Sequence, residues 1–240
     1  MIRRLLHKLI KKLPYTDRFV LRLPSATLGC GMLHEGNVFL MDHAIQNMPA
    51  GKYVLEIGSW GGLSTNMLLH FMRKHDRKEQ FLGCDPWLYQ YNEQEAEHEF
   101  GIDGRDDISR MEYMAYIRKG FMDSVMLFNR DRLPFTVPLK SDDFFDAFDK
   151  KAALTDVFGR TAILDGAFSF AYIDGNHAYE FVKRDFENVN KHLVVKGFIL
   201  FDDSFDGAQF GSAQLMKEIK RNPNYRVVYK NPNYLVQKLA

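Results

Sequence analysis

The stretch VLEIGSWGGLST, residues 54–65, decides the fold, because a short apolar run, a glycine-rich turn and a helical pattern follow one another without a break. The apolar run around Glu56 ends at Gly58, which is typical of a parallel strand that is buried on both faces. Leu63 and Met67 then recur at helical spacing. Glycines let the backbone approach a ligand closely, and the start of a helix offers free N–H groups. The stretch therefore predicts a βα unit that can bind a ligand.

The glycine spacing limits which ligand this turn can hold. Gly58, Gly61 and Gly62 do not follow the G-x-G-x-x-G pattern, which disfavours a dinucleotide. Glu56 would repel a pyrophosphate but attract a cationic ligand at the end of the strand. A glycine turn after a strand is often only a turn, but the order of strand, turn and helix favours the functional interpretation. Asp85 ends the next apolar run, where an acidic side chain binds a ribose diol in mononucleotide-binding units, although Asp-Pro also simply ends strands.

Strands alternate with helical patterns along most of the chain. The sequence predicts a Rossmann-like, doubly wound α/β fold with a mostly parallel seven-stranded sheet and an antiparallel C-terminal edge strand. Pro138 weakens the third of the expected strands. The two C-terminal runs, YRVVYK and YLVQKL, form a hairpin around the turn NPN. The five other expected strands are residues 52–58, 79–85, 135–141, 168–174 and 196–204, and the expected helices include residues 37–48 and 212–221.

Two parts of the chain fit this alternation poorly. Residues 1–50 are expected to form an N-terminal helical extension, and residues 51–240 the main domain. Within that domain, the stretches near 88–111 and 149–167 are longer than the crossovers require, so we expect lid-like insertions near the ligand face. Residues 2–13 predict a basic amphipathic helix. It packs on its own fold or on a partner subunit, or alternatively lies on an anionic membrane surface.

The composition excludes several classes of protein. The 240 residues carry a net charge of +1, which argues against a general nucleic-acid binder. Two cysteines, Cys30 and Cys84, form neither a disulfide framework nor a zinc site, and reduced buried thiols suit a cytoplasmic protein. No stretch approaches 18 uninterrupted apolar residues, so no membrane span is expected.

Acidic residues gather at the ends of two strands that should be neighbours. Asp174 closes the strand over 168–174, and Asp202 and Asp203 close the next one. Carboxylates this close repel one another and raise each other's pKa unless a cation lies between them. Oxygen ligands alone suit Mg²⁺, Mn²⁺ or Ca²⁺ rather than zinc. Alternatively, the Asp-Asp pair only caps a turn.

His177 follows Asp174 by three residues in the stretch FAYIDGNHAYE, residues 170–180. Histidine can accept a proton near neutral pH, so this residue is a candidate general base at the mouth of a buried strand. The simpler alternative is a residue at a helix start with no part in chemistry.

The motifs EIGSWGG-ST, DPW, IDGNHAYEFVKRD and GFILFDDS together resemble a known family. They are similar to those of the class I S-adenosylmethionine-dependent methyltransferases, above all the metal-dependent O-methyltransferases of the macrocin type. The resemblance covers roughly residues 35–240. Its most specific part is the D-G-x-H-x-Y run, followed 28 residues after Asp174 by the paired aspartates.

The resemblance implies a role for each matching residue. The methionine part of the cofactor would lie against Glu56 and the turn from Gly58 through Gly62 to Ser64, and the ribose against Asp85. The remaining roles are adenine contacts for Ser141 and Asp142, metal ligation for Asp174, Asp202 and Asp203, and general-base catalysis for His177, with Asp174 counted as a catalytic residue through the metal.

The predicted function is metal-dependent O-methylation of a small molecule that bears a hydroxyl group, such as a sugar or another natural product. A metal-independent N- or C-methyltransferase is one alternative, and a non-catalytic S-adenosylmethionine-binding or membrane-associated scaffold is another. A nicotinamide-dependent oxidoreductase is disfavoured by the glycine spacing. Family members often self-associate, so the resemblance also implies a homo-oligomer.

Overall fold

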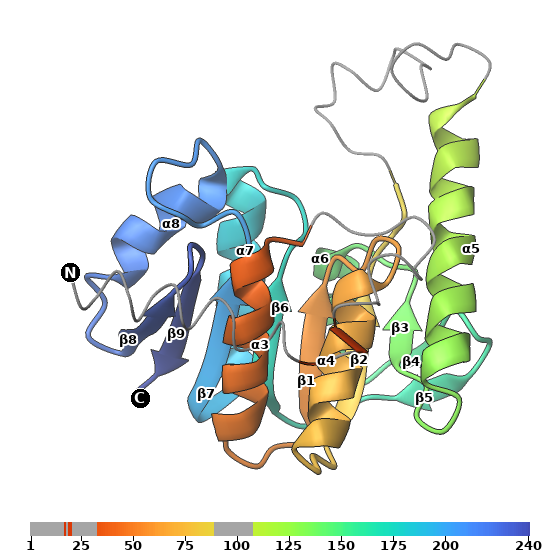
Figure 1. The fold of residues 1–240 in the computed structure, drawn as a ribbon, viewed down its shortest axis with the longest axis horizontal. Coiled ribbons are helices and arrows are strands. Elements are labelled where there is room, and N and C mark those ends of the chain that lie inside the picture. Colours follow the sequence, from red (N-terminus) through yellow and green to blue (C-terminus); the bar gives the residue numbers. More distant parts are fainter. Residues whose placement is uncertain (1–16, 18, 21–32, 89–107) are drawn as a thin grey trace.

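The computed structural model describes residues 17, 19–20, 33–88 and 108–240 (Figure 1). The predicted helix over 2–13, Cys30 and most of the expected insertion at 88–111 lie outside these residues. The described part contains a seven-stranded sheet, two layers of helices and a small two-stranded hairpin.

The large sheet has the strand order β3-β2-β1-β6-β7-β9-β8, which confirms the predicted fold class. The pairs between β3 and β7 are parallel, whereas β9 runs antiparallel to both β7 and β8 at the C-terminal edge. The chain order reverses between β1 and β6, which creates a switch point where ligands bind in open α/β sheets. The strands are β1 (Tyr53–Ile57), β2 (Gln80–Cys84), β3 (Phe135–Val137), β6 (Phe168–Ile173), β7 (Leu193–Phe201), β8 (Tyr225–Lys230) and β9 (Tyr234–Lys238).

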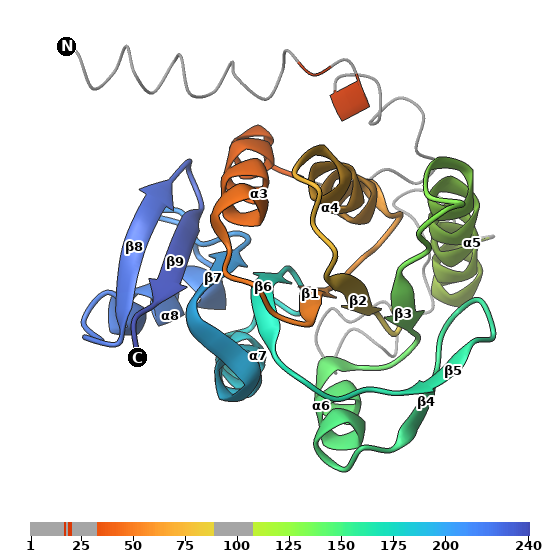
Figure 2. The ribbon, with the colours of Figure 1, turned by 90° about the horizontal axis from the view of Figure 1, so that it is seen from below.

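Helices cover both faces of the sheet, as Figure 2 shows along its edge. One face carries α3, α4 and α5, and the other carries α6, α7 and α8. The sheet is therefore doubly wound, with each crossover packed on one of its two faces. The helices are α3 (Glu35–Asn47), α4 (Leu63–Lys74), α5 (Arg110–Phe128), α6 (Ser141–Asp149), α7 (Tyr179–His192) and α8 (Gly211–Ile219).

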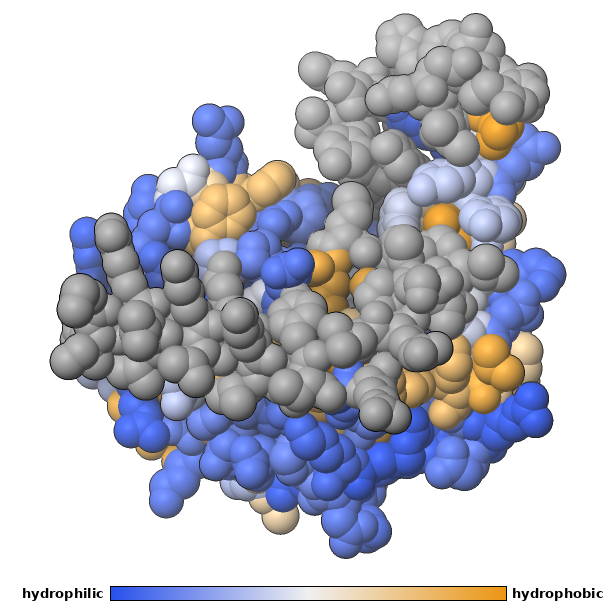
Figure 3. Space-filling model, in the orientation of Figure 1, coloured by the Kyte–Doolittle hydropathy of each residue, from blue (hydrophilic) through white to orange (hydrophobic). Residues whose placement is uncertain are grey.

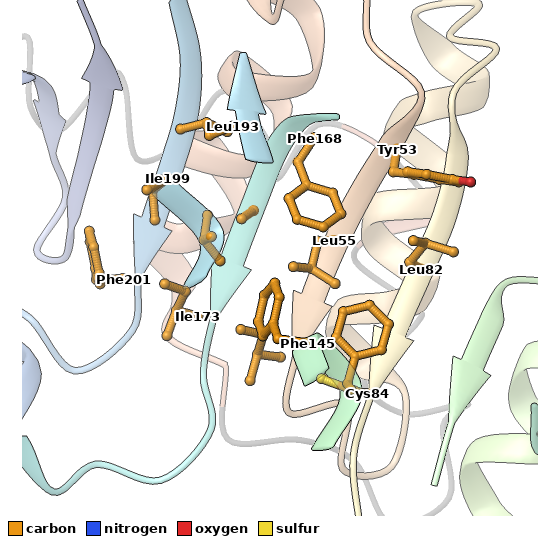
Figure 4. Packing of buried hydrophobic residues seen from close by; sticks show 14 of the residues in the cluster. Tyr53, Leu55, Leu82, Cys84, Phe145, Phe168, Ile173, Leu193, Ile199 and Phe201 are labelled. Carbon is orange, nitrogen blue, oxygen red and sulfur yellow. The ribbon is translucent and has the colours of Figure 1, made fainter. Parts of the chain in front are cut away.

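Alternating side chains of the strands feed two hydrophobic cores. Along β1, Tyr53, Leu55 and Ile57 pack toward α6 to α8, whereas Val54 packs toward α3 and α4. Figure 4 shows the first of these cores, in which Phe145 of α6 lies against the strands. Each such fully buried side chain contributes about 1.5–3 kcal/mol to stability. The strands are apolar on both faces, which is why they read as continuous apolar runs in the sequence.

The expected third strand and the expected insertion at 149–167 can both be compared with the structure. The expected third strand ends at Val137, directly before Pro138, because proline lacks the N–H that a ladder needs. The expected insertion at 149–167 contains the antiparallel hairpin of β4 (Ala153–Thr155) and β5 (Thr161–Ile163). The N–H of Val157 donates to the carbonyl of Thr136, so the hairpin lies at the β3 edge of the sheet. Its role as a lid stays a prediction.

No helix in the described part of the chain is long and apolar enough to cross a membrane.

Candidate functional site

The carboxyl ends of the parallel strands meet along one edge of the sheet and bring two groups of acidic residues there. We call Glu56 and Asp85, at the ends of β1 and β2, the β1–β2 pair. We call Asp174, His177, Asp202 and Asp203, which follow β6 and β7, the β6–β7 cluster. Because β1 and β6 are paired neighbours, the two groups lie side by side across the switch point.

Glu56 is completely buried under the first turn of α4. Its Oε2 atom accepts hydrogen bonds from the hydroxyls of Ser59, at 2.8 Å, and Thr65, and Ser64 also contacts the carboxylate. Its Oε1 atom is buried and has no hydrogen-bond partner among the residues that the structure describes. Burial raises the pKa of Glu56 to about 7, and the three hydroxyls oppose that shift. A buried acceptor without a partner is costly, and a cationic ligand would relieve that cost.

Asp85 is held by backbone amides rather than by side chains. Its Oδ2 accepts the N–H groups of Ser59 and Trp60, each at 2.8 Å, and its Oδ1 accepts that of Trp87 at 2.7 Å. Burial raises its pKa, and these three hydrogen bonds lower it. The carboxylate thereby fixes the glycine turn against the end of β2. Three of its roughly four acceptor positions are occupied, so it can accept one further hydroxyl.

The turn itself needs unusual backbone angles. Gly58 has φ = +87° and Gly62 has φ = +88°, and both are in the left-handed region that favours glycine. A Cβ on Gly58 would lie 2.0 Å from the carbonyl oxygen of Asp174, so β1 and the β6–β7 cluster are in direct backbone contact. Trp60 and Trp87 also have positive φ, at 43° and 46°. Such strain concentrates at functional sites.

Ser141 and Asp142, expected to contact adenine, lie at the start of α6. Asp142 is exposed and forms an ion pair with Arg184 of α7, at 2.9 Å. Ser141 contacts the buried carboxyl group of Asp185, whose pKa burial raises to about 7. Sequence reasoning missed Asp185. Its signal was an acidic residue on the apolar face of α7, between Val182 and Val189.

In the β6–β7 cluster, the carboxyl groups of Asp174 and Asp202 lie in hydrogen-bonding contact. The hydroxyl of Tyr172 donates to Oδ2 of Asp174 at 3.0 Å. Burial and the neighbouring carboxylate of Asp202 raise the pKa of Asp174 well above its usual range. Neighbouring carboxylates repel each other, and a cation between them would relieve that repulsion.

Asp203 and His177 complete the cluster. Nε2 of His177 lies 3.7 Å from Oδ2 of Asp203, and both side chains are about one-third exposed. Asp203 has φ = 49°, another strained residue at this edge. Burial and Asp202 raise the pKa of Asp203. The predicted proximity of the histidine to the acidic residues is thus present, through Asp203.

The residues expected to bind a metal are brought together only in part. Within the described residues, no three side chains of His, Cys, Asp or Glu form a metal-ligand set. Asp174 and Asp202 touch, while Asp203 is close enough to affect the pKa of Asp174. The donor chemistry nevertheless fits a hard divalent cation, because the contacting groups are carboxylate oxygens whose mutual repulsion a cation would relieve.

Two asparagines far away in the sequence hold this cluster, and sequence reasoning missed both. Nδ2 of Asn37, in α3, lies 2.5 Å from Oδ1 of Asp202, and Nδ2 of Asn233, in the β8–β9 turn, lies 2.6 Å from it. Both asparagines are almost fully buried. A buried asparagine gives no periodic signal, and only the tertiary fold brings these residues together.

A groove of about 480 Å³ lies elsewhere, between the end of β2 and α5. Pro86, Trp87 and one face of α5 line it, including Met114 and Met122. Figure 3 shows exposed apolar side chains along the same helix. No residue of the β6–β7 cluster lines this groove, so it is separate from that cluster.

The family profile described as a methyltransferase domain matches residues 55–204, more than half of the chain. The chain belongs to this methyltransferase family. The match includes the β1–β2 pair and the whole β6–β7 cluster, and it confirms the resemblance to the class I S-adenosylmethionine-dependent methyltransferases. No curated protein matches the chain in sequence.

Solved structures of methyltransferases share the fold across nearly the whole chain. The O-methyltransferase NovP is 16% identical, with 99% of each chain covered and a TM-score of 0.57. The calicheamicin methyltransferase CalS11 is 14% identical, covering 96% of this chain and 90% of that one, with a TM-score of 0.56. The methyltransferase PaMTH1 of Podospora anserina is 12% identical, covering 97% and 86%, with a TM-score of 0.53. At these identities the likeness shows the fold.

Proposed function

We propose that this methyltransferase transfers a methyl group from S-adenosylmethionine to a hydroxyl oxygen of a small molecule, with the help of a divalent cation. The observation that carries the proposal is the pairing of two different acidic groups at one sheet edge. The β1–β2 pair has an unpartnered buried oxygen that suits a cationic ligand, and the β6–β7 cluster combines touching carboxylates with a histidine.

The β1–β2 pair would hold the cofactor. When bound, S-adenosylmethionine would supply a methyl group on a positively charged sulfur: the acceptor oxygen would bond to the methyl carbon in line as the carbon–sulfur bond breaks, and S-adenosylhomocysteine would leave. Glu56, at the glycine turn, would stabilise the positive charge of the methionine part through its unpartnered oxygen. Asp85, with one acceptor position left, would accept one ribose hydroxyl. The backbone contact of Gly58 with Asp174 would keep the methyl group close to the β6–β7 cluster.

The β6–β7 cluster would prepare the acceptor. His177 is exposed enough to reach a bound hydroxyl, and it would remove the proton as general base. Asp203, 3.7 Å away, would stabilise the imidazolium that forms. Asp174 and Asp202 would hold a divalent cation, which lowers the pKa of a hydroxyl and orients it when bound. Oxygen nucleophiles need this ionisation more than amines do, which favours O-methylation.

The acceptor is proposed to be a hydroxyl of a sugar or of another natural product. In support, one of the similar structures is described as TDP-rhamnose 3'-O-methyltransferase, from calicheamicin biosynthesis, and another is the O-methyltransferase NovP. His177 and Asp203 are both partly exposed, so the cluster opens to an acceptor from solvent.

A metal-independent reaction is the second candidate. One observation favours it: within the described residues, the acidic side chains do not form a three-ligand set. In that case Asp174, whose pKa is raised well above its usual range, would stay protonated beside Asp202, and His177 alone would ionise the acceptor.

Calorimetric titration of the full-length protein tests the proposal. We expect S-adenosylmethionine and S-adenosylhomocysteine to bind, NAD not to bind, and Mg²⁺ to bind in a separate titration. Binding of NAD in place of S-adenosylmethionine would contradict the proposed cofactor. Binding of S-adenosylmethionine with no Mg²⁺ binding would leave the metal-independent candidate.

A further inference from the structure

We propose that Asn37 and Asn233 are positioning residues that fix the carboxylate of Asp202 for cation binding. The inference rests on the proposed function, because it gives that cation its support. Both asparagines lie outside the residues 55–204 that match the methyltransferase family. The site therefore depends on two elements beyond the matched domain, the first turn of α3 and the β8–β9 turn.

The contacts form a closed network around one carboxylate oxygen. Asn37 and Asn233 both donate to Oδ1 of Asp202. Asn233 also donates to the side-chain oxygen of Asn37 at 3.0 Å, and its own side-chain oxygen accepts the N–H of Ser204 at 2.9 Å. Each amide is thus oriented by a second hydrogen bond, so neither can rotate without leaving a buried polar group unpaired.

The backbone around this network is interlocked. Gly36, next to Asn37, lies so close to the β8–β9 turn that a Cβ there would be 1.7 Å from the carbonyl oxygen of Asn231. No residue other than glycine fits this approach without a shift of the backbone. The close packing brings α3 near enough for the side chain of Asn37 to reach Asp202 at the end of β7.

The chemistry of the donors favours a cation rather than an internal ion pair. An amide donates hydrogen bonds without adding charge, so the two asparagines orient Asp202 without supplying the positive charge that a lysine or an arginine would bring. Asp206, by contrast, has cationic partners in Lys220 and Lys230. Within the described residues, the one ion pair of these carboxylates is that of Asp203 with His177 of the same cluster, and His34 also acts electrostatically on Asp203. Both amides bind Oδ1, which leaves Oδ2 free of them to face a cation.

The test is the affinity for Mn²⁺, followed by electron paramagnetic resonance of free Mn²⁺ in titrations of the full-length protein. We expect Asn37→Ala and Asn233→Ala each to weaken Mn²⁺ binding about 10–100-fold, the usual effect of removing a residue that orients a metal ligand. The affinity for S-adenosylmethionine should stay within about twofold of wild type. If the alanine variant does not fold, Asn37→Gln takes its place in the test. Glutamine keeps the amide group but displaces it, so this variant should also lose Mn²⁺ affinity.

Asn231→Ala is the matched control. Asn231 is also buried in the β8–β9 turn, but its side-chain atoms have no hydrogen-bond partner among the described residues, so its removal should leave Mn²⁺ binding unchanged. In an Asp202→Asn background, Asn37→Ala should cause no further loss, because the two residues act as one unit.

Wild-type Mn²⁺ affinity in Asn37→Ala and Asn233→Ala would overturn the inference and leave the proposed function standing. Equal losses of Mn²⁺ and S-adenosylmethionine affinity would also overturn it, since they would indicate a structural role alone. A wild-type protein that binds S-adenosylmethionine but no Mn²⁺ would overturn the inference together with the cation step, and only failure to bind S-adenosylmethionine would remove the proposed cofactor.

Discussion

The β1–β2 pair and the β6–β7 cluster are both acidic and lie along the same sheet edge, yet they stabilise their carboxylates in different ways. Asp85 is satisfied by three backbone N–H groups and Glu56 by three hydroxyls, so each carboxylate has its own donors. In the β6–β7 cluster, Asp202 has two amide donors and Asp174 has the hydroxyl of Tyr172, but the two carboxyl groups also face each other. The first arrangement is complete except for one unpartnered oxygen, whereas the second keeps two carboxyl groups side by side, whose repulsion a cation would relieve.

The causes of the pKa shifts show the same difference. Burial is the largest cause for both Glu56 and Asp174. A like charge also raises both pKa values, but Asp202 is the second cause for Asp174, whereas Asp85 is the last cause for Glu56. Burial with a small like-charge contribution favours a carboxyl group that turns anionic when a cationic ligand arrives. Burial with like charge favours a site that gathers a cation even without a ligand. The two groups should therefore fail in different ways when they are altered.

The largest effect should come from removing the cation. With excess EDTA, we expect methyl transfer from labelled S-adenosylmethionine to fall to background and to return when Mg²⁺ is added. Asp202→Asn should show the same loss, because it removes one of the two touching carboxylates. Full activity in EDTA would show that the β6–β7 cluster works without a metal.

Changing His177 to alanine should lower kcat by about 10²–10⁴-fold, the usual contribution of a general base. Binding of S-adenosylmethionine and of Mn²⁺ should be unchanged, and the low-pH limb of the rate profile should disappear, because that limb reports protonation of the base. Steady-state kinetics across pH with titrations of both ligands check this.

His75→Ala is the matched control for that variant. His75 also pairs with an aspartate, Asp42 at 2.7 Å, but it follows the C-terminal end of α4, away from the β6–β7 cluster. We expect its kcat to equal that of wild type. A loss of less than about tenfold in His177→Ala would assign the proton transfer to another group.

The same contrast explains what the sequence could predict. The β1–β2 pair is built from local contacts, since Glu56 meets Ser59 and Thr65 within one strand-turn-helix unit. Its pattern is therefore visible in residues 54–65 alone. Parallel pairing of β6 with β7 likewise made the meeting of Asp174 and Asp202 predictable.

The long-range part of the site could not be predicted in this way. Asn37 and Asp202 are 165 residues apart, and their contact depends on how α3 packs against the β8–β9 turn. The ion pair of Asp142 with Arg184 was missed for the same reason, because it joins two helices rather than neighbouring strand ends. Periodicity and spacing identify strands and turns, but they do not identify side chains that meet through tertiary packing.

A smaller effect should appear in the stability of the cofactor-free protein. The pKa of Glu56 rises from 4.5 to about 7 on folding, so between these values the folded protein binds more protons than the unfolded one. Stability contributed by this residue is therefore present at low pH and is lost as pH rises through about 7. Glu56→Gln removes that loss, so relative to wild type it should gain roughly 2 kcal/mol between pH 5 and pH 8.

Urea unfolding of wild type and Glu56→Gln at both pH values measures this difference. Parallel dependence of the unfolding free energy on pH in the two proteins would show that Glu56 keeps its ordinary pKa in the folded state. Saturating S-adenosylmethionine should shrink the gain, because the cationic cofactor would stabilise the ionised carboxylate.

The division of labour between the β1–β2 pair and the β6–β7 cluster is tested most directly by titrating two variants with two ligands. Asp85→Ala should weaken S-adenosylmethionine binding by about 1–3 kcal/mol, the cost of losing a charge-assisted hydrogen bond, and should keep wild-type Mn²⁺ affinity. Asp202→Asn should weaken Mn²⁺ binding and should keep wild-type affinity for S-adenosylmethionine. Equal loss of both ligands in each variant, or no loss in either, would contradict the assignment of the cofactor to one group and the cation to the other.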